Sequence, residues 1–258
     1  MGSYPRSYGP RFQWGGMIAP GIKALIIAST AVFLVQTLIG LVLGPEPYRL
    51  FNGILGLVPF RVLLRFWIWQ PFTYLFLHGH IFHLLFNMLF LWMFGNDIER
   101  QWGRRRFLFY YFLCGVGAGL IDVLARAAFY PASSPAFVVP TIGASGAVYG
   151  ILLAAAVLYP DRQVMLFPFP VLVPMRVYVL IIGAIAFFGA LGTNDNISHV
   201  CHLGGIGVGY AYLRRGSFFY RIRNRYSDWQ KRRLRRRFEV YVRDHKDDRP
   251  SRPDSWVH

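Results

Sequence analysis

Two residues in separate apolar segments, a serine and a histidine, are best suited to carry out chemistry. Ser145 is flanked by Gly143 and Gly146, and His202 follows His199 in a later apolar stretch. A serine hydroxyl is a poor nucleophile until a base takes its proton, and histidine is the side chain that most often does so. If the two segments pack together, the pair forms a nucleophile–base dyad.

Glycines spaced by four accompany both residues. Gly146 and Gly150 follow the serine, and Gly205 and Gly209 follow the histidine. Small residues at this spacing let two membrane helices approach to backbone contact. Taken alone, the pattern indicates close packing and no chemistry. Here it also predicts the contact that would bring the hydroxyl and the imidazole within hydrogen-bond reach.

A second polar cluster lies in an earlier apolar block, which contains His78, His80, His83 and Asn87. The last two are four residues apart, so they share one face of a helix. Polar residues within membrane segments are costly and usually mark function. Five of the seven histidines fall in this block and in the segment of His202. Clustering of this kind makes a purely structural role for them the weaker interpretation.

Imidazoles also bind metals, so a metal-handling membrane protein is the alternative from another class. No His-Glu-xx-His motif is present, and among these histidines the only acidic or thiolate neighbour is Cys201. We therefore expect no metal and no cofactor.

The carboxylates are poorly placed to complete a triad. Asp195 lies seven residues before His202, in a polar turn, and would approach only if that turn folds inward. Asp122 is followed four residues later by Arg126, on the same helix face, so an internal ion pair is the natural interpretation. We therefore expect a dyad.

Long apolar blocks must position these residues. The chain of 258 residues is 55% hydrophobic and only 16% charged, against about 25% charged in an ordinary soluble domain. A bilayer core needs about 20 apolar residues per helix. The pattern excludes a soluble fold and predicts an all-α, polytopic membrane helix bundle with six transmembrane helices, at roughly residues 22–43, 71–94, 107–130, 142–159, 175–191 and 199–213.

Composition and charge divide the chain into three predicted regions: a disordered leader (residues 1–20), the six-span domain (21–213) and a basic tail (214–258). Fifteen of the 28 Lys and Arg residues lie in the tail. By the positive-inside rule we expect a multi-pass membrane protein with both termini in the cytoplasm. The tail is expected to bind anionic lipid headgroups; it carries no motif for nucleic acid, so none is expected as a partner.

Three motifs in register resemble those of the rhomboid intramembrane serine proteases: His78-xxxx-His83-xxx-Asn87, Gly143-Ala144-Ser145-Gly146 and His202-Leu203-Gly204-Gly205. The charged stretch Glu99-Arg100-x-Trp102-Gly103 is similar to the turn after the family's second span. The resemblance covers roughly residues 20–213, and the compact six-span core without an added span implies a protein of the cell membrane. Each motif is weak, but the set in order is specific.

The resemblance implies a serine endopeptidase that cleaves transmembrane segments of membrane proteins. Ser145 would be the nucleophile and His202 the general base. His83 and Asn87, with the backbone N–H of Ser145, would donate hydrogen bonds to the oxyanion, and Tyr149 would pack against the catalytic histidine.

The family pattern also implies supporting roles. Gly143 and Gly146 would keep the backbone open around the nucleophile, and His78 would be structural. A non-catalytic scaffold of rhomboid type is a further alternative. The presence of both the serine and the histidine argues against it.

Overall fold

The computed structural model describes residues 17–131, 133–166, 169–192 and 198–215. The chain divides into two units, residues 1–211 and 212–258. Most of the predicted leader and nearly all of the predicted basic tail lie outside the described residues, as does Asp195. The domain boundaries and the binding of the tail to lipid therefore stay predictions.

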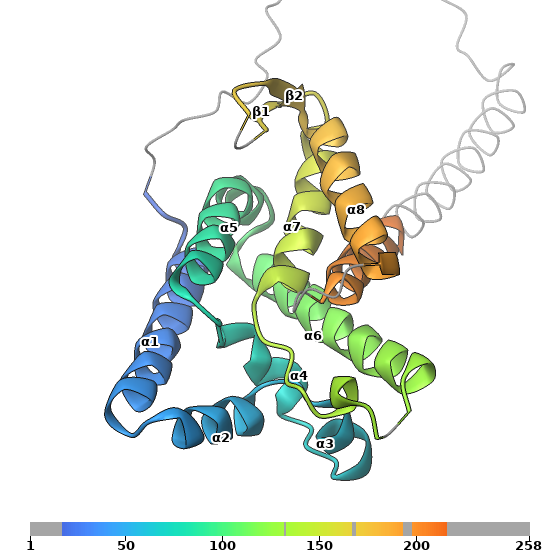
Figure 1. The fold of residues 1–258 in the computed structure, drawn as a ribbon. Coiled ribbons are helices and arrows are strands. Elements are labelled where there is room, and N and C mark those ends of the chain that lie inside the picture. Colours follow the sequence, from blue (N-terminus) through green and yellow to red (C-terminus); the bar gives the residue numbers. More distant parts are fainter. Residues whose placement is uncertain (1–16, 132, 167–168, 193–197, 216–258) are drawn as a thin grey trace, which may run out of the picture. The chain divides into compact units, whose positions relative to one another are not determined.

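Helices form most of the described part of the first unit (Figure 1). Three of them are long and apolar enough to cross a membrane: α1 (Pro20–Val42), α5 (Ile81–Trp102) and α6 (Arg104–Phe129). Two shorter apolar helices follow, α7 (Ser145–Leu158) and α8 (Met175–Gly192). Residues 199–215 are helical as well. The all-α membrane bundle is confirmed, whereas the count of six spans stays a prediction.

The predicted second span is wrong at both ends. Hydropathy predicts it at residues 71–94, but α5 begins at Ile81 and ends at Trp102. His78 and His80 therefore precede the helix. The backbone of His80 is extended and its Nδ1 accepts a hydrogen bond from the N–H of His83 at 3.1 Å, so this residue caps α5. Hydropathy alone does not separate an apolar helix from the apolar turns that precede it.

Four short helical segments connect α1 to α5: α2 (Pro45–Leu55), α3 (Pro59–Leu64), α4 (Gln70–Thr73) and the 3₁₀ turn η1 (Tyr74–Phe76). Proline stands in the first turn of α2, α3 and α4, where its missing N–H costs nothing. Buried amides hold the connection. The Gln36 amide donates to Asn52 Oδ1 at 2.7 Å and accepts from the His78 N–H at 3.1 Å.

The charged stretch after the second span forms a helix-to-helix junction. α5 continues through Glu99, and the turn is reduced to Gly103, whose φ of 81° favours glycine. The Glu99 carboxylate accepts hydrogen bonds from the N–H groups of Gly21 and Ile22 at 2.7 and 2.8 Å. It thus caps the N-terminus of α1, where a negative charge is favourable.

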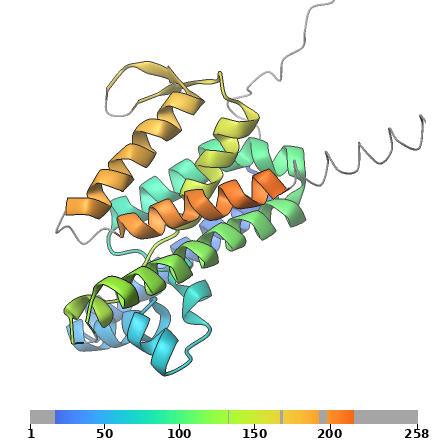
Figure 2. The same cartoon turned by 90° about the vertical axis from the view of Figure 1, so that its right-hand side faces the viewer.

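The remaining connections include two small elements that the sequence did not predict. A 3₁₀ turn, η2 (Pro135–Phe137), lies between α6 and α7. Two antiparallel strands, β1 (Gln163–Met165) and β2 (Leu172–Pro174), form a hairpin between α7 and α8. Figure 2 shows the helix of residues 199–211 (the darker of the two orange helices) running along α6 (green). This contact positions the helix that contains His202.

Candidate active site

Ser145 is the first residue of α7. Two residues earlier Gly143 has a φ of 123°, which disfavours any residue with a side chain. A Cβ at this position would lie 2.6 Å from His83 Nε2, so a side chain here would also displace the ring of His83. The Gly143 N–H donates to the carbonyl of Tyr74 at 2.9 Å. The backbone before the serine is therefore fixed by η1 on one side and by His83 on the other.

His202 lies one turn into the helix of residues 199–215. Its Nε2 is 2.7 Å from the Ser145 hydroxyl oxygen, across a separation of 57 residues in the chain. This is hydrogen-bond distance. The structure therefore brings together the two residues that the sequence singled out.

Two rings flank the imidazole of His202. Tyr149, one turn after Ser145 on α7, stacks on it with 4.3 Å between ring centroids and 6° between planes. His199 meets it edge-on at 6.0 Å and 89°. The ring of His199 lies against Gly189 of α8, where a Cβ would be 2.5 Å from its Cε1. Tyr149 and His199 thus restrict the orientation of the histidine beside the serine.

Glycines permit the contact between the two helices, as their spacing predicted. A Cβ on Gly205 would collide with the carbonyl oxygen of Gly146, so the two backbones touch. The other two glycines face α6: a Cβ on Gly150 would lie 2.6 Å from Cys114 Sγ, and one on Gly209 would lie 2.5 Å from the Tyr110 hydroxyl. The glycine-containing faces therefore let α7 and the helix of His202 pack onto α6 as well as onto each other.

The replacement Gly205→Ala is expected to lower stability by about 1–3 kcal/mol, the usual cost of overpacking. Its Cβ meets backbone, which cannot rotate away. Gly207→Ala is the matched control, because this exposed position of the same helix has open space around it. Alanine there should be neutral or stabilising, since it favours helix. Thermal unfolding in detergent measures both, and equal melting temperatures would contradict the backbone contact.

The predicted oxyanion residues lie on α5. The ring of His83 lies against the backbone of Gly143. Asn87 is buried, and its side-chain N–H₂ donates to the backbone carbonyl of His83 at 2.8 Å, which leaves one N–H of the amide for another acceptor. His78 is fully buried and packs edge-on against the ring of His83 at 5.1 Å. Its structural role stays a prediction.

In the described part of the chain, no group of three or more His, Cys, Asp or Glu side chains is placed to hold an ion. The pairing predicted for Asp122 and Arg126 is present, with 3.2 Å between Oδ2 and Nε. The carboxylate also has partners that the sequence did not indicate, Thr141 and Ser198. No spacing rule connects these three residues, since they belong to different segments.

Comparison with known proteins places this chain in a family. The family model described as "Rhomboid domain" matches residues 65–217, more than half of the chain. The chain belongs to the rhomboid family. The matched region contains the serine, the histidine and the candidate oxyanion residues. The resemblance expected from the three motifs is thereby confirmed.

Several rhomboid relatives are similar to this chain over long stretches. The "RHOMBOID-like protein 12, mitochondrial" of Arabidopsis thaliana is 32% identical over 211 residues, which cover 76% of this chain and 59% of that protein. The "Rhomboid protease AarA" of Providencia stuartii is 29% identical over 197 residues, covering 72% and 68%. The "Rhomboid protein 1, mitochondrial" of Saccharomyces cerevisiae is 31% identical over 140 residues, covering 53% and 38%. The chain thus spans between 38% and 59% of the length of the two mitochondrial relatives.

Proposed function

We propose that this rhomboid family member is an intramembrane serine endopeptidase that cleaves transmembrane segments of membrane proteins. The observation that carries the proposal is the distance of 2.7 Å between Ser145 Oγ and His202 Nε2. Two relatives that are similar to this chain are named proteases, the AarA protein and the "Rhomboid protease GluP" of Bacillus subtilis.

In the proposed reaction, His202 Nε2 takes the hydroxyl proton as Ser145 Oγ attacks the carbonyl carbon of the scissile bond. The C=O electrons move to oxygen and give a tetrahedral oxyanion. The imidazolium then returns its proton to the leaving amine, and the C–N bond breaks. Water, activated by the same imidazole, hydrolyses the acyl-enzyme and regenerates the serine.

The oxyanion needs donors that are already aimed at it. We propose the side chains of His83 and Asn87 and the N–H of Ser145, the first residue of α7. At the start of a helix the N–H groups have no partner within the helix, and the helix dipole favours negative charge there. Such preorganised donors stabilise charge that exists only in the transition state. Gly143, which lies against His83, allows the donors and the nucleophile to be close.

The short α7 supports a reaction below the membrane surface. Its 14 residues span about 21 Å at 1.5 Å each, less than a hydrocarbon core of about 30 Å. Since Ser145 begins the helix, we propose that it lies inside the bilayer zone, reached by water from the extracytoplasmic face. From the charge distribution we also propose that both termini are cytoplasmic, and from the resemblance of the predicted six-span core we propose the cell membrane.

One experiment tests both activity and orientation. Intact spheroplasts and inverted vesicles are treated with a membrane-impermeant fluorophosphonate, and the modified peptide is identified by mass spectrometry. We expect labelling of Ser145 in spheroplasts, unaffected by chelator, and cleavage of a model transmembrane substrate by the purified protein. No labelling in either preparation would favour a non-catalytic scaffold. Labelling only in inverted vesicles would reverse the proposed orientation.

A further inference from the structure

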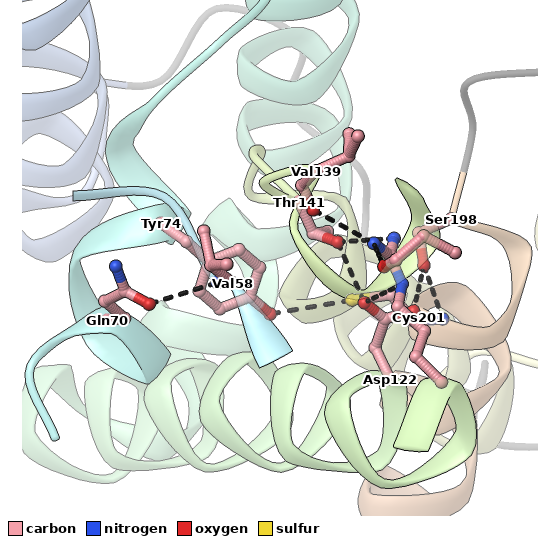
Figure 3. Close-up of polar contacts among 10 residues, drawn as sticks. Val58, Gln70, Tyr74, Asp122, Val139, Thr141, Ser198 and Cys201 are labelled. Carbon is pink, nitrogen blue, oxygen red and sulfur yellow. Dashed lines mark hydrogen bonds and ion pairs between the residues drawn. The ribbon is translucent and has the colours of Figure 1, made fainter. Parts of the chain in front are cut away.

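A buried carboxylate joins the two segments that carry the dyad. Asp122 lies in α6 and is 2% exposed. Its Oδ2 accepts a hydrogen bond from the Thr141 hydroxyl at 2.8 Å, and its Oδ1 accepts one from the Ser198 hydroxyl at 2.5 Å. Figure 3 shows both hydroxyls pointing toward this one side chain. Each carboxylate oxygen therefore holds a different segment of the chain.

Arg126 fixes the direction of these hydrogen bonds. Its guanidinium is 3.2 Å from Asp122 Oδ2 and donates to the Thr141 hydroxyl oxygen at 2.7 Å. Because arginine can only donate, the Thr141 oxygen accepts from it and uses its own proton on Asp122. The guanidinium also donates to the carbonyls of Ala136 and Val139 at 3.2 Å. The buried charges are thus paired and hydrogen-bonded, as burial requires.

The two hydroxyl residues precede the two dyad residues by the same number of positions in the sequence. Thr141 is four residues before Ser145, and Ser198 is four residues before His202. The backbone of Thr141 pairs with Leu57 through two hydrogen bonds of 2.9 Å, in the stretch that leads to Gly143. The Ser198 oxygen accepts from the Cys201 N–H at 3.3 Å, which caps the helix of the histidine.

We propose that Asp122 is a positioning residue of the active site, which sets the separation of Ser145 and His202 by anchoring the segment before each of them. The proposal rests on the proposed function. Its physical reason is that two reacting side chains on separate segments need a common reference, and a displacement of about 1 Å can cost about 10²-fold in rate. A carboxylate suits this role because it accepts on both oxygens.

The test uses variants that each remove one link and little volume. Ser198→Ala removes the link from Asp122 to the helix of His202, and Thr141→Val removes the link from Asp122 to the segment before the serine. We expect turnover per fluorophosphonate-labelled site to fall about tenfold in each variant, with KM changed less than about twofold, because positioning acts on the reacting atoms. Thr141→Ser keeps the hydroxyl and should restore most of the turnover.

The double variant gives the sharpest result. If one carboxylate couples the two segments, breaking either link already uncouples them, so Ser198→Ala with Thr141→Val should be little worse than the poorer single variant. Independent effects would multiply instead. The matched control is Asp97→Asn, which breaks the ion pair of 2.9 Å between Asp97 and Arg162, away from both segments. Its turnover per labelled site should equal that of the parent.

Counting labelled sites separates positioning from folding. A merely structural role would lower the fraction of protein that labels, or its melting temperature, and leave turnover per labelled site within about twofold of the parent. That outcome, or multiplied losses in the double variant, would overturn the proposal. Failure of the proposed function would be visible earlier, as a parent protein that neither labels at Ser145 nor cleaves, and the inference would fall with it.

Discussion

Alanine at Ser145 or at His202 is expected to abolish cleavage of a transmembrane substrate, with a loss of about 10⁴-fold or more in kcat. Ser145→Ala removes the only atom that attacks the peptide carbonyl in the proposed reaction. His202→Ala removes the group that lies 2.7 Å from that atom and accepts its proton. Because the two residues act as a unit, the double variant should be no worse than either single one. Cleavage in liposomes, followed by gel and mass spectrometry, measures the effect.

His199→Ala is the decisive control for the base. Its ring lies 6.0 Å from that of His202, and it is the other histidine of the same helix. We expect this variant to cleave at a rate far above that of His202→Ala. The matched control for Ser145→Ala is Ser29→Ala, which removes a different buried hydroxyl, in α1. A protein with alanine at both dyad positions that still cleaves would falsify the dyad.

Loss of either candidate oxyanion donor is expected to have the second largest effect. His83→Ala and Asn87→Ala should each lower kcat by about 10²–10³-fold, the usual cost of losing one such donor. KM should change little, because the negative charge they stabilise is absent from the bound substrate. Rates at saturating and at low substrate concentration separate the two parameters.

The matched control on α5 is Phe82→Ala. Its ring is 62% exposed and lies in the same first turn of the helix, so it tests loss of a large side chain beside His83 without loss of a donor. Melting temperatures of all three variants show whether the helix is intact. A KM increase with unchanged kcat in the His83 and Asn87 variants would instead assign these residues to substrate binding.

The helices differ in how well hydropathy predicts their ends. The apolar blocks match α1, α6 and α8 to within about three residues at each end, because a helix must satisfy its own backbone in a bilayer. The block at residues 71–94 does not match α5, since two short helical segments and a turn are as apolar as a span. Their placement depends on hydrogen bonds to distant parts of the chain: Gln70 of α4 donates to the Gly53 carbonyl, and the His78 N–H donates to Gln36 of α1.

Those buried amides are a signal that hydropathy overlooks. Gln36 stands within an apolar block and Gln70 next to a proline, and both are almost fully buried. Polar residues in such places are expensive unless they are paired. Their partners are groups of the connection between α1 and α5, which no residue pattern reveals. The same holds for Thr141 and Ser198, whose shared partner Asp122 is known only from the fold.

Residue types and their spacing predict the candidate site, and the apolar blocks predict which segments form membrane helices. Ser145, His202, His83 and Asn87 are recognisable because polar groups in apolar helices are rare and costly. Only the tertiary structure decided that the serine and the histidine are neighbours, through the contact of Gly146 with Gly205, and that one buried aspartate connects their segments. Distances between residues far apart in the chain depend on packing, which depends on every side chain between them.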